Sequence, residues 1–317
     1  MALLPVDLQA PLAPRRGAPS VSEVLNSLRM LSDHIRAVDV AHPPDGWIAS
    51  EGLLDPQSGL LASLLDRIGQ RYVESRRHAA AVSFMLRFGW SAGPMIAAHL
   101  GLRCHFRYQD YSLRFASSTA LEAVCVQHCE LIESSADPGA SRCRLLDELI
   151  AHTEPVLEAQ HRWSRVSRRA LWSMATSTWA AQFVEIAERL GDAELGRREA
   201  EAMFDVVPKI RRAAPRMYSV ASGDRQGVCQ VRGACCLSYK GPSRQHCMVC
   251  PLIADDERTQ RSSTWVASRP QVRAIDPALA AATLRGWTAS ASQAENTRRS
   301  PSACDGVASF PSSVETR

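Results

Sequence analysis

Four cysteines lie within sixteen residues of this chain, and their spacing is the feature that most directly suggests chemistry. Cys235 and Cys236 are adjacent, ten residues separate them from Cys247, and Cys250 follows after two more. Five of the ten cysteines fall between Cys229 and Cys250. Because cysteine is used mainly for its reactivity, such clustering indicates a functional site, and thiolates are soft ligands that select zinc, cuprous copper or iron–sulfur clusters.

The spacing favours a binuclear cluster over a single ion. A structural zinc site usually has two Cys-x2-4-Cys knuckles, each bringing two sulfurs to one ion, and here only Cys247–Cys250 is such a knuckle. The side chains of the adjacent pair Cys235-Cys236 diverge, which suits two bridged irons. A [2Fe–2S] cluster takes four protein ligands, so these four cysteines complete the set. Lys240-Gly-Pro-Ser243 between the halves is a turn signal that lets the chain reverse.

Basic residues outnumber acidic ones around the cysteines. The segment 224–246 contains Asp224 as its single acid, against Arg225, Arg232, Lys240 and Arg244. A reduced cluster carries one more negative charge than an oxidised one, so this surplus of positive charge favours the reduced state.

The flanking residues add a family resemblance. Arg232-Gly-Ala-Cys-Cys-Leu-Ser-Tyr-Lys240 followed by Cys247-Met-Val-Cys-Pro-Leu252 resembles the C-terminal motif of FhuF-like ferric siderophore reductases, in which Cys-Cys-x10-Cys-x2-Cys binds [2Fe–2S]. The resemblance implies a variable helical body before the motif, ligand roles for the four cysteines, and one-electron reduction of a ferric siderophore in the cytoplasm. Two features depart from the family: the tail after Leu252 is longer, and Cys229 is an additional thiol.

Other parts of the reaction must come from partners. The chain has no Gly-x-Gly-x-x-Gly, P-loop or His-Glu-x-x-His motif. A reductase of this kind therefore needs an external electron donor, such as a ferredoxin, a flavodoxin or a flavin reductase. No catalytic residue beyond the cluster ligands is implied.

Three other interpretations of the cysteines stay open. The protein is then a non-catalytic iron–sulfur redox sensor or electron carrier, a zinc-stapled binding module, or a disulfide-bonded protein. Disulfides are disfavoured, because adjacent cysteines form a strained bridge and no secretory signal is visible.

Composition sets broad limits. The chain has 317 residues with 45% hydrophobic content, a formal charge of +4 and a pI near 8.6, so it is long and apolar enough for a substantial core and is not basic enough to indicate nucleic-acid binding. Ala79–Leu102 is apolar but interrupted by Arg87, Gly93-Pro94 and His99, which predicts a buried core helix rather than a membrane span. We expect a cytoplasmic protein, with peripheral attachment to the inner face of the membrane left open.

The apolar periodicity predicts a mainly α (α+β) fold, in which a helical body with a short β-hairpin precedes a small cysteine-rich iron–sulfur segment. We divide the chain into a loose leader (1–19), a helical FhuF-like body (20–221), a [2Fe–2S]-binding segment (222–254) and a tail predicted to be disordered because it is rich in Ser, Thr, Ala, Arg and Pro (255–317). Cys304 stands alone in that tail, beyond a weakly helical stretch at Pro277–Trp287.

Local patterns predict the individual elements. Helices are expected over Val21–Val38, over Gly59–Tyr72, from Arg77 to Gly93-Pro94, into the region of Ile150, and from Glu154-Pro155 to Leu190. Alternating residues on either side of Gln109-Asp110 predict a hairpin, and Thr119-x-x-Glu122 is a capping box that predicts a further helix reaching Ile132. His42–Gly59 and Ser134–Ser141 are predicted loops.

Three further groups have a functional and a structural interpretation. Cys125, His128 and Cys129 are a second metal site or, by preference, core residues of a helix. The tryptophans Trp163, Trp172 and Trp179 line a chelate site or, by preference, fill the core. Basic residues form two groups that either bind anions or an acidic electron donor, or simply lie on solvated helix faces. We prefer the second interpretation. The groups are Arg162, Arg165, Arg168 and Arg169, and Lys209, Arg211, Arg212 and Arg216.

Overall fold

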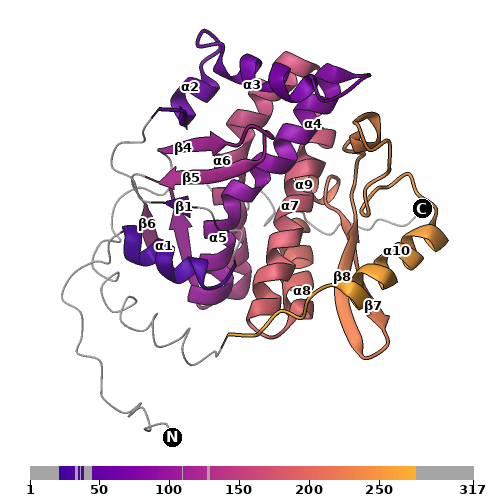
Figure 1. Cartoon of the computed structure of the whole chain (residues 1–317). Helices are drawn as coiled ribbons and strands as arrows, with labels where there is room; N and C mark the ends of the chain where they lie inside the picture. The colour runs from indigo at the N-terminus through magenta and orange to yellow at the C-terminus, as the bar shows by residue number, and fades with distance from the viewer. Residues whose placement is uncertain are drawn as a thin grey trace, which may run out of the picture.

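The computed structural model describes residues 21–32, 35, 37–38, 45–108, 110–126 and 129–275. It confirms the predicted mainly α (α+β) class, with long helices at the centre and small sheets on one side (Figure 1). On the other side lies a β-hairpin followed by the segment 232–254, which contains the four cysteines and is called the cysteine loop below. The helices are α1 (Val21–Arg29), α2 (Ser50–Leu54), α3 (Leu60–Gly69), α4 (Arg76–Phe88), α5 (Gly93–Ala97), α6 (Pro138–Ser164), α7 (Arg168–Arg189), α8 (Ala193–Phe204), α9 (Pro208–Arg211) and α10 (Asp255–Ser268). The strands are β1 (Ala37–Val38), β2 (Ile48–Ala49), β3 (Cys104–Arg107), β4 (Tyr111–Phe115), β5 (Leu121–Val126), β6 (Glu130–Glu133), β7 (Arg216–Ser222) and β8 (Arg225–Val231).

Helix α7 is the centre of the molecule. Almost every residue from Leu171 to Ala187 is buried, with Trp179 and Phe183 fully enclosed. Helices α4, α6 and α8 pack around it, and a helix covered on all sides is apolar or small all round. Its Ser, Thr and Ala side chains let neighbours approach closely: a Cβ added to Gly89, just after α4, would lie 2.8 Å from the Cβ of Thr178. Trp172 and Trp179 are core residues, as preferred above.

The predicted hairpin around Gln109-Asp110 is wrong in its pairing, although both its strands exist. β3 pairs with β6 in a separate antiparallel ladder, while β4 pairs with β5 and β2 in a four-stranded sheet of order β1-β5-β4-β2. Alternation of apolar residues identifies a strand, but its partner is set by contacts distant in sequence. The four-stranded sheet is antiparallel except where β1 joins β5 in parallel.

The helix predicted from Thr119 to Ile132 is also wrong, because this stretch forms β5 and β6. Thr119 has φ +64° in the turn that leads into β5, and Glu122 pairs with Arg114 of the neighbouring strand at 3.1 Å instead of capping a helix. Val124 and Val126 are β-branched and buried, which suits a strand with partners on both edges. The proposed group Cys125, His128 and Cys129 is therefore not on a helix face, and His128 lies outside the described residues.

The boundary between α6 and α7 lies ten residues later than Glu154-Pro155. α6 continues through Pro155 and ends at Ser164, where Arg165 adopts φ +61°. The Ser167 side chain then accepts a hydrogen bond from the Ala170 N–H and caps α7. Pro155 removes only one backbone donor from the helix. At the break between the helices, the hydroxyls of Ser164 and Ser167 accept hydrogen bonds from the backbone N–H groups of Val166 and Ala170.

The N-terminal elements differ from prediction mainly in length. α1 ends at Arg29, although Val24, Leu25, Leu28, Leu31 and Ile35 are buried as the periodicity requires. The predicted loop at 42–59 contains β2 and α2, with residues 42–44 outside the described part. α4 ends before Gly93-Pro94 as expected, and the chain then continues through a 3-10 turn, α5 and a π turn to Leu102.

The apolar stretch Ala79–Leu102 is core, as expected, with Phe84, Met85 and Phe88 fully buried. None of the helices in the described ranges has the length and hydropathy needed to cross a bilayer.

One buried histidine makes stability depend on pH. His152 of α6 stacks on Phe88 with ring centroids 5.0 Å apart, and its Nε2 lies 2.7 Å from Ser91 Oγ. Burial lowers the pKa of His152 to about 3, against about 6.5 in the unfolded chain. The unfolded chain takes up this proton first as the pH falls, so the stabilisation is present above about pH 6.5 and is lost between about 6.5 and 3.

We predict that His152→Gln flattens this pH dependence by about 1.4 kcal/mol per pH unit between about pH 6 and 4. Urea unfolding of both proteins across that range measures the difference, in which the titration of all other groups cancels. Equal slopes for the two proteins contradict the prediction.

Candidate metal centre

A two-stranded hairpin carries the chain to the cysteines. β7 and β8 pair from Arg216 with Val231 to Ser222 with Arg225, around a two-residue Gly223-Asp224 turn in which Gly223 has φ +63°. The hairpin crosses the predicted boundary between residues 221 and 222. This hairpin is not among the predicted elements, although the two-residue turn Gly223-Asp224 between runs with β-branched residues is a recognisable hairpin signal.

The four predicted ligands meet as two pairs. The sulfurs of Cys236 and Cys247 lie 3.6 Å apart, and Cys250 lies close enough to Cys235 to contribute to its raised pKa. Each pair joins one cysteine of the adjacent doublet to one of the Cys-x2-Cys knuckle. The structure therefore brings together all four residues that the sequence singles out, with diverging partners for the adjacent cysteines.

Backbone hydrogen bonds fix the two halves. Arg232 N–H donates to Val249 O at 3.0 Å, which ties the start of the first half to the second half. Cys250 N–H donates to Cys247 O at 3.0 Å and closes the knuckle. Between the halves, Gly241 N–H donates to Ser238 O at 2.9 Å and Arg244 N–H donates to Gly241 O at 3.2 Å, so the predicted turn at residues 240–243 is confirmed.

N–H groups point at the sulfurs. Leu237 N–H lies 3.4 Å from Cys235 Sγ, and Leu252 N–H lies 3.5 Å from Cys250 Sγ. Arg232 Nη1 lies 3.7 Å from Cys247 Sγ, and Ser238 donates to Cys236 through its backbone and side chain. Each of the four sulfurs thus faces at least one N–H donor.

The thiols of the Cys236–Cys247 pair share one proton. The Cys247 thiol donates to the Cys236 sulfur and lowers the pKa of Cys236 to about 4, with a further contribution from the charge of Arg232. The same hydrogen bond, together with burial, raises the pKa of Cys247. Burial raises the pKa of Cys235 to about 11, against the opposing effect of the Leu237 N–H. Of the two thiols, Cys236 is the one whose thiolate is favoured, beside the fixed positive charge of Arg232.

Arg232 anchors the cysteines to α7. Its side chain is buried, and Nε donates to Ser177 Oγ at 3.1 Å. Ser177 Oγ in turn donates to Gln230 Oε1 at 3.2 Å, and Gln230 Nε2 donates to Ser177 O at 3.0 Å. The next residue, Gly233, passes so close to the body that an added Cβ would lie 2.7 Å from Ala213 O and 2.9 Å from Ser173 Oγ. Only glycine fits there without displacement.

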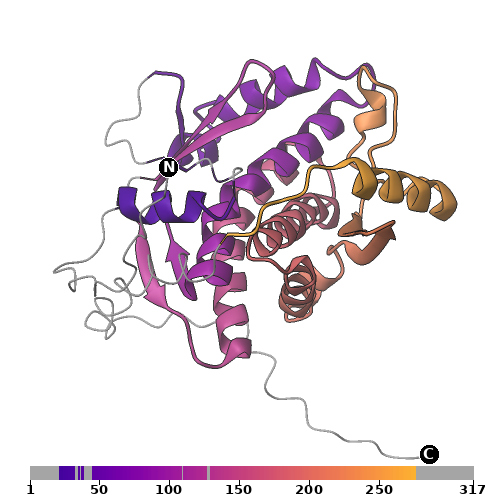
Figure 2. The same ribbon diagram turned by 60° about the horizontal axis from the view of Figure 1, so that its bottom comes forward.

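The cysteine loop also rests on the turn between α3 and α4, as both overall views show (Figure 1, Figure 2). Val73 N–H donates to Lys240 O at 3.4 Å, and Lys240 Nζ donates to Ser75 Oγ at 2.8 Å. Lys240 also lies 3.7 Å from the Glu74 carboxylate. These contacts join segments more than 160 residues apart.

Helix α10 holds the loop from the other side, so the disorder predicted from residue 255 is wrong for this helix. Arg258 is buried, and Nη2 donates to Cys250 O at 3.2 Å and to Ile253 O at 2.8 Å. Arg261 Nη1 donates to His246 O at 3.0 Å. The helix packs on β7 and β8. Residues 276–317, including Pro277–Trp287 and Cys304, lie outside the described part, as does the leader 1–19.

Cys229 does not join the four cysteines. It lies on β8, is 5% exposed, and is hydrogen bonded to Ser262 of α10, which also contacts the Tyr218 hydroxyl at 2.8 Å. Burial raises its pKa. Its surroundings are those of a packed structural thiol. Each described cysteine is a free thiol.

The basic groups identified in the sequence lie largely among acids. Arg168 pairs with Glu158 at 2.6 Å, and Lys209 pairs with Glu154 at 2.6 Å. Arg211 lies 3.4 Å from Asp205, and Arg216 lies 3.9 Å from Asp255. These are exposed pairs on helix and strand surfaces, which fits the solvated-face interpretation. Docking of an acidic donor on them stays a prediction.

Comparison with known proteins gives no assignment. No model of a known protein family matches this sequence, and no curated protein matches it. Within the described ranges, no cluster of three or more His, Cys, Asp or Glu side chains is arranged to hold a single metal ion.

We predict that Ser177→Ala destabilises the protein by about 1–3 kcal/mol, because it leaves Arg232 Nε and Gln230 Oε1 without the hydroxyl that each contacts. Ser173→Ala is the matched control. Ser173 is buried one turn earlier on α7, and its Oγ makes no hydrogen bond with the described residues.

Urea unfolding of both variants tests this comparison. Ser173→Ala is expected to change stability by less than about 0.5 kcal/mol. Equal losses in the two variants contradict an anchoring role for Ser177.

Proposed function

We propose that this protein is a [2Fe–2S] ferric siderophore reductase that transfers one electron to chelated Fe(III) in the cytoplasm. The observation that carries the cofactor is the arrangement of the thiols in two pairs, Cys236 with Cys247 and Cys235 with Cys250. The substrate rests on the resemblance of Arg232–Leu252 to the FhuF-like motif.

The paired thiols suit a cluster better than a single ion. In a [2Fe–2S] cluster with four cysteine ligands, each iron takes two of them, which matches two separate pairs. A tetrahedral zinc site usually draws its ligands from two Cys-x2-4-Cys knuckles, and this segment has only one, Cys247–Cys250. The donor set is entirely sulfur, which agrees with iron–sulfur chemistry.

The surrounding residues match the demands of such a group. N–H groups of Leu237 and Leu252 and the guanidinium of Arg232 would stabilise thiolate charge, and hydrogen bonds to sulfur raise the reduction potential of iron–sulfur centres. Cys236 and Cys250 are buried while Cys235 and Cys247 are half-buried. One side of the site is thus shielded from water and the other remains open to a partner.

When bound, a [2Fe–2S] cluster accepts and passes on one electron at a time. Chelated Fe(III) that gains this electron becomes Fe(II), which binds hard oxygen ligands less tightly, so reduction releases the iron. The described chain offers no nucleotide-binding motif, so we assign the supply of electrons to an external ferredoxin, flavodoxin or flavin reductase.

We predict that serine substitution of Cys235, Cys236, Cys247 or Cys250, one at a time, removes most of the bound iron after anaerobic purification, because each variant lacks one of the four thiolates that would hold the cluster. Cys229→Ala is the matched control, since that thiol contacts Ser262 instead. It is expected to keep the iron content and visible absorption of the unchanged protein. Iron retention in all four ligand variants contradicts the assignment.

Stopped-flow oxidation of the dithionite-reduced protein by ferric complexes tests the reaction. Ferric catecholate and hydroxamate chelates are expected to restore the oxidised spectrum in a rate that rises with chelate concentration, with Fe(II) trapped by ferrozine. A protein that holds the cluster but reacts with no ferric chelate is instead a redox sensor or electron carrier. A protein that holds zinc is a binding module.

A further inference from the structure

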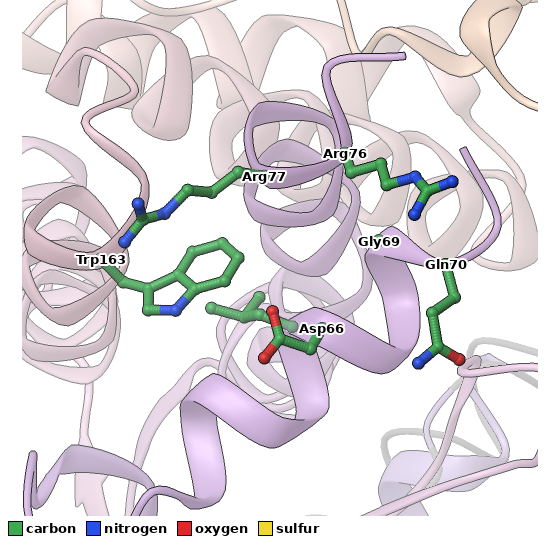
Figure 3. Close-up of a pocket in the computed structure, with 7 residues that line it drawn as sticks. Asp66, Gly69, Gln70, Arg76, Arg77 and Trp163 are labelled. Carbon is green, nitrogen blue, oxygen red and sulfur yellow. The ribbon is translucent and has the colours of Figure 1, made fainter. Parts of the chain in front are cut away.

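A cavity of about 420 Å³ opens between α3, the start of α4 and the end of α6 (Figure 3). Its volume is within the range of about 300–1,000 Å³ that small-molecule sites occupy. The lining combines two arginines, an indole ring, an acid, an amide and apolar surface: Arg76, Arg77, Trp163, Asp66, Gln70, Leu65 and Gly69.

The arginines of the cavity are available to a ligand. Arg77 lies over the ring of Trp163, with its guanidinium carbon 4.9 Å from the ring centroid. Arg76 uses only Nε, which donates to Tyr72 O at 3.1 Å. Within the described ranges, neither guanidinium pairs with a carboxylate. Two arginines against the single acid Asp66 give the lining a net positive charge.

The shape and charge of the lining select a chemical class. A guanidinium binds anionic oxygens through directed N–H groups, and the half-buried indole of Trp163 offers apolar surface for a ring. Figure 3 shows Arg77 and Trp163 together on one side of the cavity, and Arg76 with Gln70 on the other. An aromatic ring that carries negatively charged oxygens satisfies both features.

The cavity is mechanically connected to the cysteines. Its walls Gly69 and Arg76 flank the turn 70–75, and the cysteine loop is hydrogen bonded to that turn through Val73 and Ser75. A molecule seated in the cavity therefore lies one turn of chain away from the loop that contains Cys235 and Cys236.

We propose that this cavity binds the catecholate arm of an anionic ferric chelate, an inference that rests on the function proposed above. A tris-catecholate complex of a trivalent metal is trianionic and presents aromatic rings, whereas a tris-hydroxamate complex is neutral and presents none. The cavity therefore favours catecholate over hydroxamate chelates.

Gallium(III) complexes test the site without electron transfer, because gallium(III) matches the charge of Fe(III) and is not reduced. Isothermal titration of the purified full chain with gallium(III) tris-catecholate is expected to show saturable binding, and gallium(III) tris-acetohydroxamate is expected to bind at least tenfold more weakly. Free 2,3-dihydroxybenzoate, which has the ring but a smaller charge, is also expected to bind more weakly than the complex.

Variants locate the binding. Arg76→Ala combined with Arg77→Ala is expected to weaken binding of the catecholate complex about tenfold or more, since each arginine supplies charge-assisted hydrogen bonds. Trp163→Leu is expected to weaken it about threefold, and Asp66→Asn to strengthen it by removing the repelling charge. Arg67→Ala is the matched control, because Arg67 is an exposed arginine of α3 outside the lining, and it is expected to have little effect.

Several results overturn the proposal. The proposal fails if the catecholate complex does not bind, or if the hydroxamate complex or free dihydroxybenzoate binds equally well. It also fails if the double variant and Arg67→Ala have equal effects. The proposed function fails separately. A protein that holds the cluster and reduces chelates but binds the gallium complex without regard to Arg76 and Arg77 refutes the cavity alone, whereas a protein that binds it but holds no iron refutes the reductase alone.

Discussion

The close seating of Arg232 and Gly233 against α7 is the contact on which the cysteine site depends. Arg232 turns away from β8 into a buried position where its side chain meets Ser177 and Cys247 and its N–H meets Val249. Gly233 permits this approach because no other side chain fits beside Ala213 O. The first cysteine doublet follows immediately, so its position relative to the helical body is set by these two residues. A single buried arginine thus joins the body, the hairpin and Cys247 of the Cys-x2-Cys knuckle.

The remaining supports of the cysteine loop come from one segment that precedes it in the sequence and one that follows it. The α3–α4 turn contributes Val73 and Ser75, and α10 contributes Arg258 and Arg261. Both segments contribute hydrogen bonds to the loop. The four cysteines span only sixteen residues, so the helical body supplies most of the contacts that hold them. The body fixes the loop geometry, and the cavity at its edge offers a place where a small molecule can approach the loop.

Sequence reasoning succeeded where the determining contacts are local. The cysteine spacing and the turn at residues 240–243 lie within one short segment, so the approach of the two halves of the motif follows from the pattern itself. The strands β3 and β4 were predicted but given the wrong partners, and β5 and β6 were predicted as a helix, because apolar residues at 119–132 fit a helix or a strand and only distant partners such as β1 decide between them. Helix α10 was missed for a different reason. Its buried face consists of Arg258, Ser262 and Val266, so two of the three buried positions are polar and hydropathy gives no periodic signal.

The central claim is that two pairs of thiols hold two bridged irons. Native mass spectrometry of the full chain, purified and sprayed without oxygen, tests it most directly because it reads the bound atoms in an intact molecule. The account predicts the mass of the polypeptide increased by two irons and two sulfides. A mass increased by one zinc, or the bare polypeptide mass even after anaerobic reconstitution with iron and sulfide, would contradict it.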